Sequence, residues 1–145
     1  MIPKFRAWLK EEEEMQDVLA FDTRGHSFLG IEGTHVRVEG WCDYFEVDKQ
    51  AVIMQSSGYD DINGVEMFHG DIVWDEFNKR CGVLLFDRGA FRIMFARACP
   101  FLSVAKDEVR VVGDVFRNSE LLEDYSLKNM CEREFGVSIE KEMEE

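Results

Sequence analysis

Residues 82–95 read Gly82-Val83-Leu84-Leu85-Phe86-Asp87-Arg88-Gly89-Ala90-Phe91-Arg92-Ile93-Met94-Phe95. The apolar run before Asp87 and the alternating run after Gly89 are typical of two short strands, the second with Phe91, Ile93 and Phe95 on one face. The Asp-Arg-Gly segment between them is typical of a turn, because Asp and Gly are common turn residues. The stretch therefore predicts an antiparallel hairpin within a β-rich domain.

Short apolar runs on both sides of this hairpin predict further strands. They are separated by glycines or polar residues and are too short for helices. The runs surround Phe5 and cover 28–29, 36–38, 52–54, 65–74 and 109–116. Short strands with glycine-rich corners are typical of small barrels and sandwiches. The predicted fold is mainly β: a small barrel or sandwich-like domain of short antiparallel strands with a C-terminal α-helix.

The clearest turn signal is Asp60-Asp61-Ile62-Asn63-Gly64. Asn-Gly accommodates positive φ at two successive residues, which predicts a type I′ hairpin turn. A calcium-binding EF-hand loop is the alternative, with Asp61 and Asn63 as ligands. That alignment puts Tyr59 at the first ligand position and Gly70 at the position of the bidentate glutamate. Because two essential ligands are missing, the sequence favours the turn.

The last part of the chain predicts an amphipathic helix between Ser126 and Phe135, followed by Gly136 as its stop. Four apolar residues lie on one face of that helix: Leu127, Met130, Cys131 and Phe135. We therefore expect a β domain over residues 1–118. An acidic helical extension over residues 119–145 is expected to pack on it or beside it.

Charge excludes one broad class of function. The chain has 145 residues, with 17 Lys and Arg against 30 Asp and Glu, and a formal net charge of −13. A general phosphate-backbone clamp needs a basic footprint, so we expect no direct nucleic-acid partner. The sequence has no long apolar run and no basic start followed by an apolar stretch, which predicts neither a membrane span nor a signal peptide. We expect a cytoplasmic protein with no membrane partner.

The cysteines are far apart and form no CxxC pair, which predicts buried thiols in a reducing compartment. They are Cys42, Cys81, Cys99 and Cys131. A zinc site assembled in space with His26, His35 or His69 is the alternative, since zinc accepts mixed ligands. The spacing favours isolated residues, so no metal ligand, cofactor or catalytic residue is assigned.

Three blocks of sequence together resemble the YopX family of small phage and prophage proteins. They are residues 2–8 (Ile-Pro-Lys-Phe-Arg-Ala-Trp), residues 54–64 with 68–73, and residues 111–122. The resemblance covers about residues 1–122, with 9–50 matching only loosely. It implies a mainly β, barrel-like domain, self-association into a homo-oligomer, and a gene carried by a phage or prophage of a bacterial host. It implies no activity, because the family transfers no catalytic residue and no cofactor.

Five residues in these blocks are not explained by turn geometry and are the candidate binding residues: Arg6, Trp8, Gln55, Ser56 and Asp71. A structural interpretation is that they form a buried polar network that satisfies loop backbone groups. The functional interpretation is a contact face, since Trp and Arg are common interface anchors. The leading hypothesis is a non-enzymatic, self-associating interaction module that binds a host or phage protein.

Two other functions remain as alternatives. A metal-dependent phosphodiesterase or nuclease would gather carboxylates around Mg²⁺ or Mn²⁺. The carboxylates available for it are Asp60, Asp61, Asp71, Asp75 and Glu76. An acidic DNA mimic would instead present Glu11–Glu14 and the acidic C-terminal stretch to a host DNA-binding protein. The glutamate run is also typical of a solvated loop, which is the commoner role of such runs.

Overall fold

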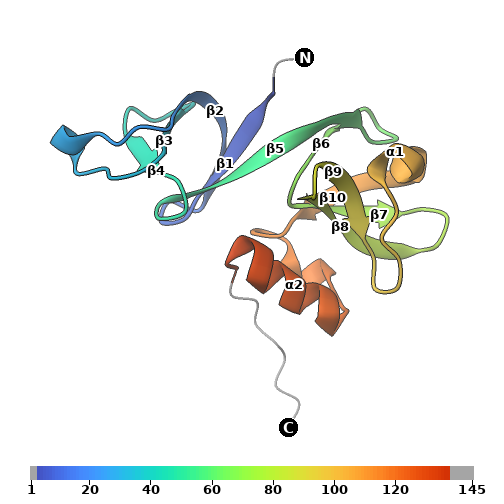
Figure 1. Ribbon diagram of the computed structural model, residues 1–145. Helices are drawn as coiled ribbons and strands as arrows, with labels where there is room; N and C mark the ends of the chain where they lie inside the picture. Colours follow the sequence, from blue (N-terminus) through green and yellow to red (C-terminus); the bar gives the residue numbers. More distant parts are fainter. Residues whose placement is uncertain (1–2, 138–145) are drawn as a thin grey trace, which may run out of the picture. The chain divides into compact units, whose positions relative to one another are not determined.

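A computed structural model describes residues 3–137, so residues 138–145 of the expected extension lie outside the described residues. These residues form ten strands in two antiparallel sheets. The chain divides into two compact units, residues 1–56 and 57–145. The strands and helices of both units are labelled in Figure 1. The division at residue 56 does not coincide with the boundary expected at residue 118.

The first unit is one antiparallel sheet with the strand order β4-β3-β2-β1-β5. Its strands are β1 (Phe5–Leu9), β2 (Glu14–Asp22), β3 (His35–Val38), β4 (Tyr44–Glu46) and the first part of β5 (Ala51–Asp60). The loop between β2 and β3 contains a 3-10 turn at Ser27–Leu29. One face of the sheet carries the core, formed by Ala7, Leu9, Val36, Val38, Phe45 and Ala51.

The second unit is built on a sheet with the strand order β10-β7-β8-β9. Its strands are β7 (Asp71–Asp75), β8 (Arg80–Asp87), β9 (Ala90–Met94) and β10 (Val109–Asp114). The end of β5 pairs with β6 (Glu66–Phe68). Two helices complete the unit, α1 (Leu102–Ala105) and α2 (Tyr125–Phe135).

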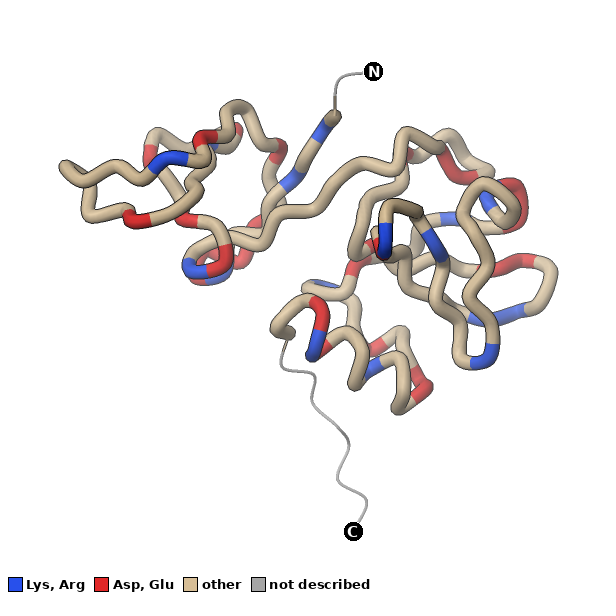
Figure 2. Tube along the Cα trace, in the orientation of Figure 1, with Lys and Arg blue, Asp and Glu red and all other residues tan. Residues whose placement is uncertain are grey.

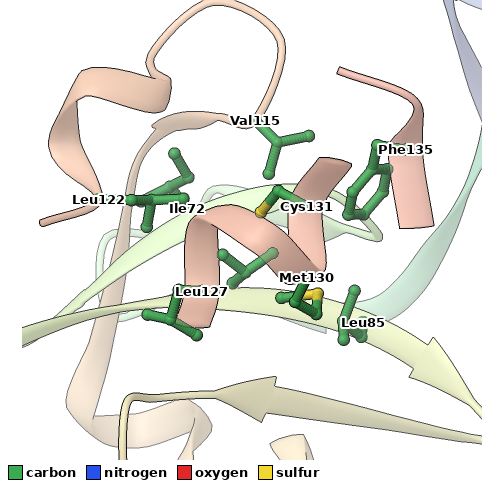
Figure 3. Close-up of a cluster of buried hydrophobic side chains, with 9 residues drawn as sticks. Ile72, Leu85, Val115, Leu122, Leu127, Met130, Cys131 and Phe135 are labelled. Carbon is green, nitrogen blue, oxygen red and sulfur yellow. The ribbon is translucent and has the colours of Figure 1, made fainter. Parts of the chain in front are cut away.

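Alternation along β8 buries both faces of this sheet. Val83 and Leu85 lie in the cluster with α2, whose apolar stripe is the one predicted from the sequence (Figure 3). Leu84 lies in the cluster on the opposite face, with Leu102 and Ala105 of α1. The sheet is therefore covered on both sides by helical segments.

The mainly β prediction and the C-terminal helix are confirmed. Asp124 caps the start of α2 by accepting from the Ser126 and Leu127 amides, and Gly136 ends it in a left-handed conformation. Of the two predicted forms, the sandwich-like one is confirmed; the sheet does not close into a barrel, because the end strands β9 and β10 do not pair with each other. A barrel removes its edges by that pairing. Here α1 and α2 bury the two apolar faces of an open sheet instead.

The turn prediction needs one correction. Gly64 has φ +79°, but Asn63 is not in the positive-φ region, so this turn is not type I′. The Asp61 carboxylate accepts the amides of Asn63 and Val65, both at 2.8 Å, and fixes a turn with one left-handed residue. The two-residue turn with successive positive φ lies in the hairpin of 82–95, at Arg88 and Gly89.

All four cysteines are free thiols, and their burial differs. Cys131 is buried in the α2 core, and burial raises its pKa to about 12. Cys42 is exposed, which corrects the expectation that every thiol is buried. Within residues 3–137, no helix is both long enough and apolar enough to cross a membrane.

Candidate functional site

Arg6 and Trp8 lie on the sheet face opposite the core of the first unit. On β1 the alternate residues Ala7 and Leu9 are fully buried in that core. Residues directly opposite each other in an antiparallel pair point to the same face of the sheet. The strand register therefore shows which residues of the neighbouring strands lie on the same face as Arg6 and Trp8. It adds Asp17 and Met15 of β2 and Met54 and Val52 of β5. We call Arg6, Trp8, Met15, Asp17 and Val52 the β1 outer face.

The other three predicted residues are placed differently. Ser56 follows Met54 by two residues, and its amide donates to the Lys4 carbonyl at 2.8 Å. Gln55 is directly opposite Phe5, and so points to the other side of the sheet. Asp71 belongs to the second unit, where it is buried and accepts the Phe68 amide at 2.8 Å.

Asp71 is one of four buried aspartates in the second unit that hydrogen-bond to the backbone. Asp61 accepts the Asn63, Val65 and Val111 amides. Asp75 accepts the Phe77 and Asn78 amides. Asp114 accepts the Phe116 and Arg117 amides and the Arg117 guanidinium. These bonds give turn and strand-end amides hydrogen-bond partners within the protein.

This arrangement is unlike the carboxylate cluster that a nuclease would need. Among residues 3–137, no group of three or more His, Cys, Asp or Glu is arranged to hold a metal ion. Asp75 illustrates the alternative use of a carboxylate. Burial opposes its charge, but donors from Asn78, Phe77 and Arg80 outweigh that effect and lower its pKa below the ordinary 3.8.

A second feature of the first unit is a pocket of about 310 Å³ on the β2-β3-β4 part of its sheet. We call it the histidine pocket; it is lined by Ala20, Phe21, Asp22, His26, His35, Arg37 and Tyr44. His35 and Arg37 alternate with the core residues Val36 and Val38 on β3, so they point away from the core. Across β3, Asp22 is opposite His35, while Ala20 and Tyr44 are both opposite Arg37.

A β-bulge in β2 creates this arrangement. Val18 pairs with Val38, but Ala20 pairs with Arg37, so Leu19 is an extra residue. One extra residue reverses the side to which every following side chain points. Because of the bulge, Asp22 joins His35 on the outer side, the same side as Asp17 and the β1 outer face. Without the bulge, alternation from Val18 would place Asp22 on the core side of the sheet.

Three aromatic rings form the body of the histidine pocket. The His35 and Tyr44 ring centroids are 5.2 Å apart, and those of His26 and Tyr44 are 5.9 Å apart. His26 is brought in by the loop before β3, where its amide donates to the Ile31 carbonyl at 2.8 Å. His35 is only 4% exposed, and its Nδ1 atom is buried without a hydrogen-bond partner.

The carboxylates around His35 are held in their charged form. The Arg24 amide and guanidinium donate to Asp22 and lower its pKa. Glu46 is directly opposite His35 on β4. Its carboxylate accepts from Lys49 and from the Glu32 amide, and these bonds lower its pKa.

Another pocket, of about 460 Å³, lies in the second unit beside the start of α2. Its lining includes Trp74, Lys79, Arg80 and Arg97 together with Glu123. The Arg80 guanidinium is already paired with Asp75 at 3.4 Å and lies over the Phe95 ring at 4.0 Å. Lys79 is paired with Glu76 at 3.8 Å. Two of the three cationic side chains that line this pocket, Lys79 and Arg80, therefore already form ion pairs within the protein.

Comparison with known proteins places the chain in a family. The family model described as YopX protein matches residues 4–123. This chain belongs to the YopX family. The chain is also similar to a solved structure, described as the crystal structure of protein EF1440 from Enterococcus faecalis. The TM-score is 0.58 with 26% sequence identity, over 85% of this chain and 99% of that chain. No significant match to a curated protein was found.

Proposed function

We propose that this YopX-family chain is a self-associating interaction module of phage or prophage origin. It acts in the cytoplasm of a bacterial host by binding a host or phage protein, and carries out no reaction itself. The β1 outer face is the observation that supports this proposal. It places a half-buried Trp beside an Arg, between Met15 and Val52, on the side of the sheet opposite the core.

That composition fits an interface. Trp, Met and Arg are enriched in the centres of protein interfaces, and Trp and Arg dominate the hot spots. Arg6 also lies close to Met54, with its guanidinium 3.8 Å from the Sδ atom. The strand pairing of β1 on both edges fixes Arg6 and Trp8 on a rigid sheet, which lowers the entropy cost of binding.

Charge gives no support to a nucleic-acid partner. Figure 2 shows Lys and Arg in short, separate segments interspersed with Asp and Glu along the described trace. A phosphate-backbone clamp needs these cations gathered on one surface.

The test combines self-association with partner binding. Sedimentation over a range of concentrations compares the wild type with Trp8→Lys and Arg6→Glu. Phe77→Lys is the matched control, since Phe77 is an aromatic residue that is 78% exposed in the turn after β7. A hot-spot loss of about 2 kcal/mol raises the self-dissociation constant by more than about tenfold. We expect that rise for both β1 variants and none for the control.

Affinity capture from phage-carrying cells, after nuclease treatment, tests the partner. A protein that binds the wild type again after purification, and fails to bind Trp8→Lys, supports the proposal. Binding that collapses at high salt would favour the acidic DNA mimic instead. A wild type that remains monomeric and retains no protein would overturn the proposal.

A further inference from the structure

The histidine pocket contains hydrogen-bond donors that the protein does not use. Within residues 3–137, the Arg37 guanidinium, the Tyr44 hydroxyl and the His26 ring nitrogens have no hydrogen bond or ion pair. His35 adds a buried imidazole whose Nδ1 has no partner. Four donor-bearing side chains from β3, β4 and the preceding loop thus line one pocket.

The one carboxylate that lines the pocket is occupied. The Asp22 Oδ1 atom accepts the Arg24 amide at 2.8 Å and Nε at 3.3 Å, and Oδ2 accepts the other guanidinium nitrogen at 3.5 Å. Arg24 therefore balances the charge of Asp22. The charge of Arg37 is left without a counterion in the pocket, although the whole chain has a net charge of −13.

The missing partner of this pocket must accept hydrogen bonds and carry negative charge. A phosphate group does both, since it has several acceptor oxygens, and arginine binds it through two parallel hydrogen bonds. Imidazole and phenol groups add donors of the kind that orient such a group. The volume of about 310 Å³ is at the lower end of small-molecule pockets. It leaves room for an organic group beside the Tyr44 and His26 rings.

We propose that the histidine pocket binds the phosphate group of a small molecule. Arg37 supplies the charge, Tyr44 and His26 donate from the rim, and His35 donates from the floor. In this assignment the His35 proton is on Nε2, because Nδ1 has no acceptor nearby to receive a hydrogen bond. This site uses different side chains from the β1 outer face, and it stands or falls independently of the proposed interaction function.

The three histidines provide an internal control for the test. His26 and His35 line the pocket, whereas His69 lies in the second unit and accepts the Phe86 amide on Nδ1 at 2.8 Å. The experiment is a titration of the ¹⁵N-labelled full chain with inorganic phosphate, followed by long-range ¹H–¹⁵N spectra of the imidazole rings at constant pH and ionic strength. We expect saturable shifts of the His26 and His35 ring signals, and no shift of His69.

Variants separate binding in the pocket from general salt effects. Arg37→Gln removes the charge of an exposed residue and is expected to weaken phosphate binding by about tenfold or more, as a charge-assisted pair implies. Arg133→Gln is the matched control, because Arg133 is an exposed arginine on α2. Sodium chloride at the same ionic strength must give no shifts.

Titrations with adenosine monophosphate, adenosine and inorganic phosphate distinguish a site for a phosphorylated organic molecule from a site for the phosphate ion alone. Tighter binding of the monophosphate than of phosphate identifies contacts to the organic group, and equal binding identifies a site for the phosphate alone. Either result supports the proposal. Shifts with adenosine alone, equal shifts with chloride, unchanged binding in Arg37→Gln, or no shift of His26 and His35 at millimolar phosphate would each overturn it.

Discussion

The buried aspartates of the second unit and the buried His35 of the first unit differ in how their polar atoms are hydrogen-bonded. In the second unit, Asp61, Asp75 and Asp114 each accept at least two backbone amides. In the first unit, His35 is equally buried but leaves Nδ1 without a partner. A saturated group stabilises the fold, whereas an unsatisfied one costs stability. The comparison teaches that the aspartates stabilise the fold, whereas burial of the His35 ring costs stability.

The largest effect that tests this comparison is expected from Asp61→Ala. It removes the acceptor of three backbone amides, including Val111 at 2.7 Å on β10. An unsatisfied buried amide costs about 1–3 kcal/mol, and the exposed turn amides less, so we expect a loss of about 3 kcal/mol. Urea unfolding measures it. Asp60→Ala, at the exposed neighbouring position, is the control and should change stability little. Equal losses for both variants would contradict the structural role of Asp61.

Gly82→Ala probes the close packing of the second unit. A Cβ atom at Gly82 would lie 2.7 Å from the Ile93 Cγ2 atom and 2.7 Å from the Phe95 ring. Overpacking of this kind costs about 1–3 kcal/mol, so thermal unfolding should show a lowered midpoint. Gly33→Ala is the control, since a Cβ there meets nothing within 4 Å. Unchanged stability in Gly82→Ala would contradict this close packing, because it would show that β8 and the Ile93 and Phe95 side chains move apart at little cost.

Asp124→Ala removes the cap of α2 and should cost about 1 kcal/mol. The Ser126 hydroxyl and the Leu127 and Ser126 amides lower the pKa of Asp124. A lowered folded-state pKa means that this contribution is present above the ordinary value of 3.8 and is lost as the pH falls through the folded-state pKa. The difference between wild type and variant in urea unfolding should therefore shrink in acid. A difference that is constant with pH would contradict the capping role of the charge.

The smallest effect is expected from His35→Phe. The change keeps a ring of similar size and removes a polar atom that has no partner, so stability should change by less than about 1 kcal/mol. Urea unfolding in phosphate-free buffer measures it beside Asp61→Ala. A loss as large as that of Asp61→Ala would show that His35 is structural, and would remove the contrast between the units.

Sequence patterns predicted the elements whose signals are local. The spacing of Leu127, Met130, Cys131 and Phe135 identified α2, and Gly136 identified its end, because a helix stripe and its stop depend on nearby residues. The hairpin around Arg88 and Gly89 was predicted for the same reason. The sequence did not show that each sheet stays open, since closure depends on pairing between strands far apart in the chain.

The histidine pocket was only partly visible in the sequence. The sequence indicates His26 and His35 only as alternative zinc ligands, and alternation around Val36 places His35 and Arg37 on one side of a strand. Tyr44 enters only through the pairing of β3 with β4. Asp22 enters through the bulge at Leu19, for which the sequence has no distinct signal. Cross-strand register therefore assembled the site, and a single sequence does not report register.

Strand β5 has a practical consequence for dividing the molecule. It pairs with β1 through Ala51–Gln55 and with β6 at its other end, so one strand contributes hydrogen bonds to both units. A fragment that ends before Ala51 would lose the β5 edge of the first sheet, and a fragment that begins after Asp60 would leave β6 without its neighbour. Dissection by expression of separate pieces should therefore keep Ala51–Asp60 in each piece, as a shared overlap.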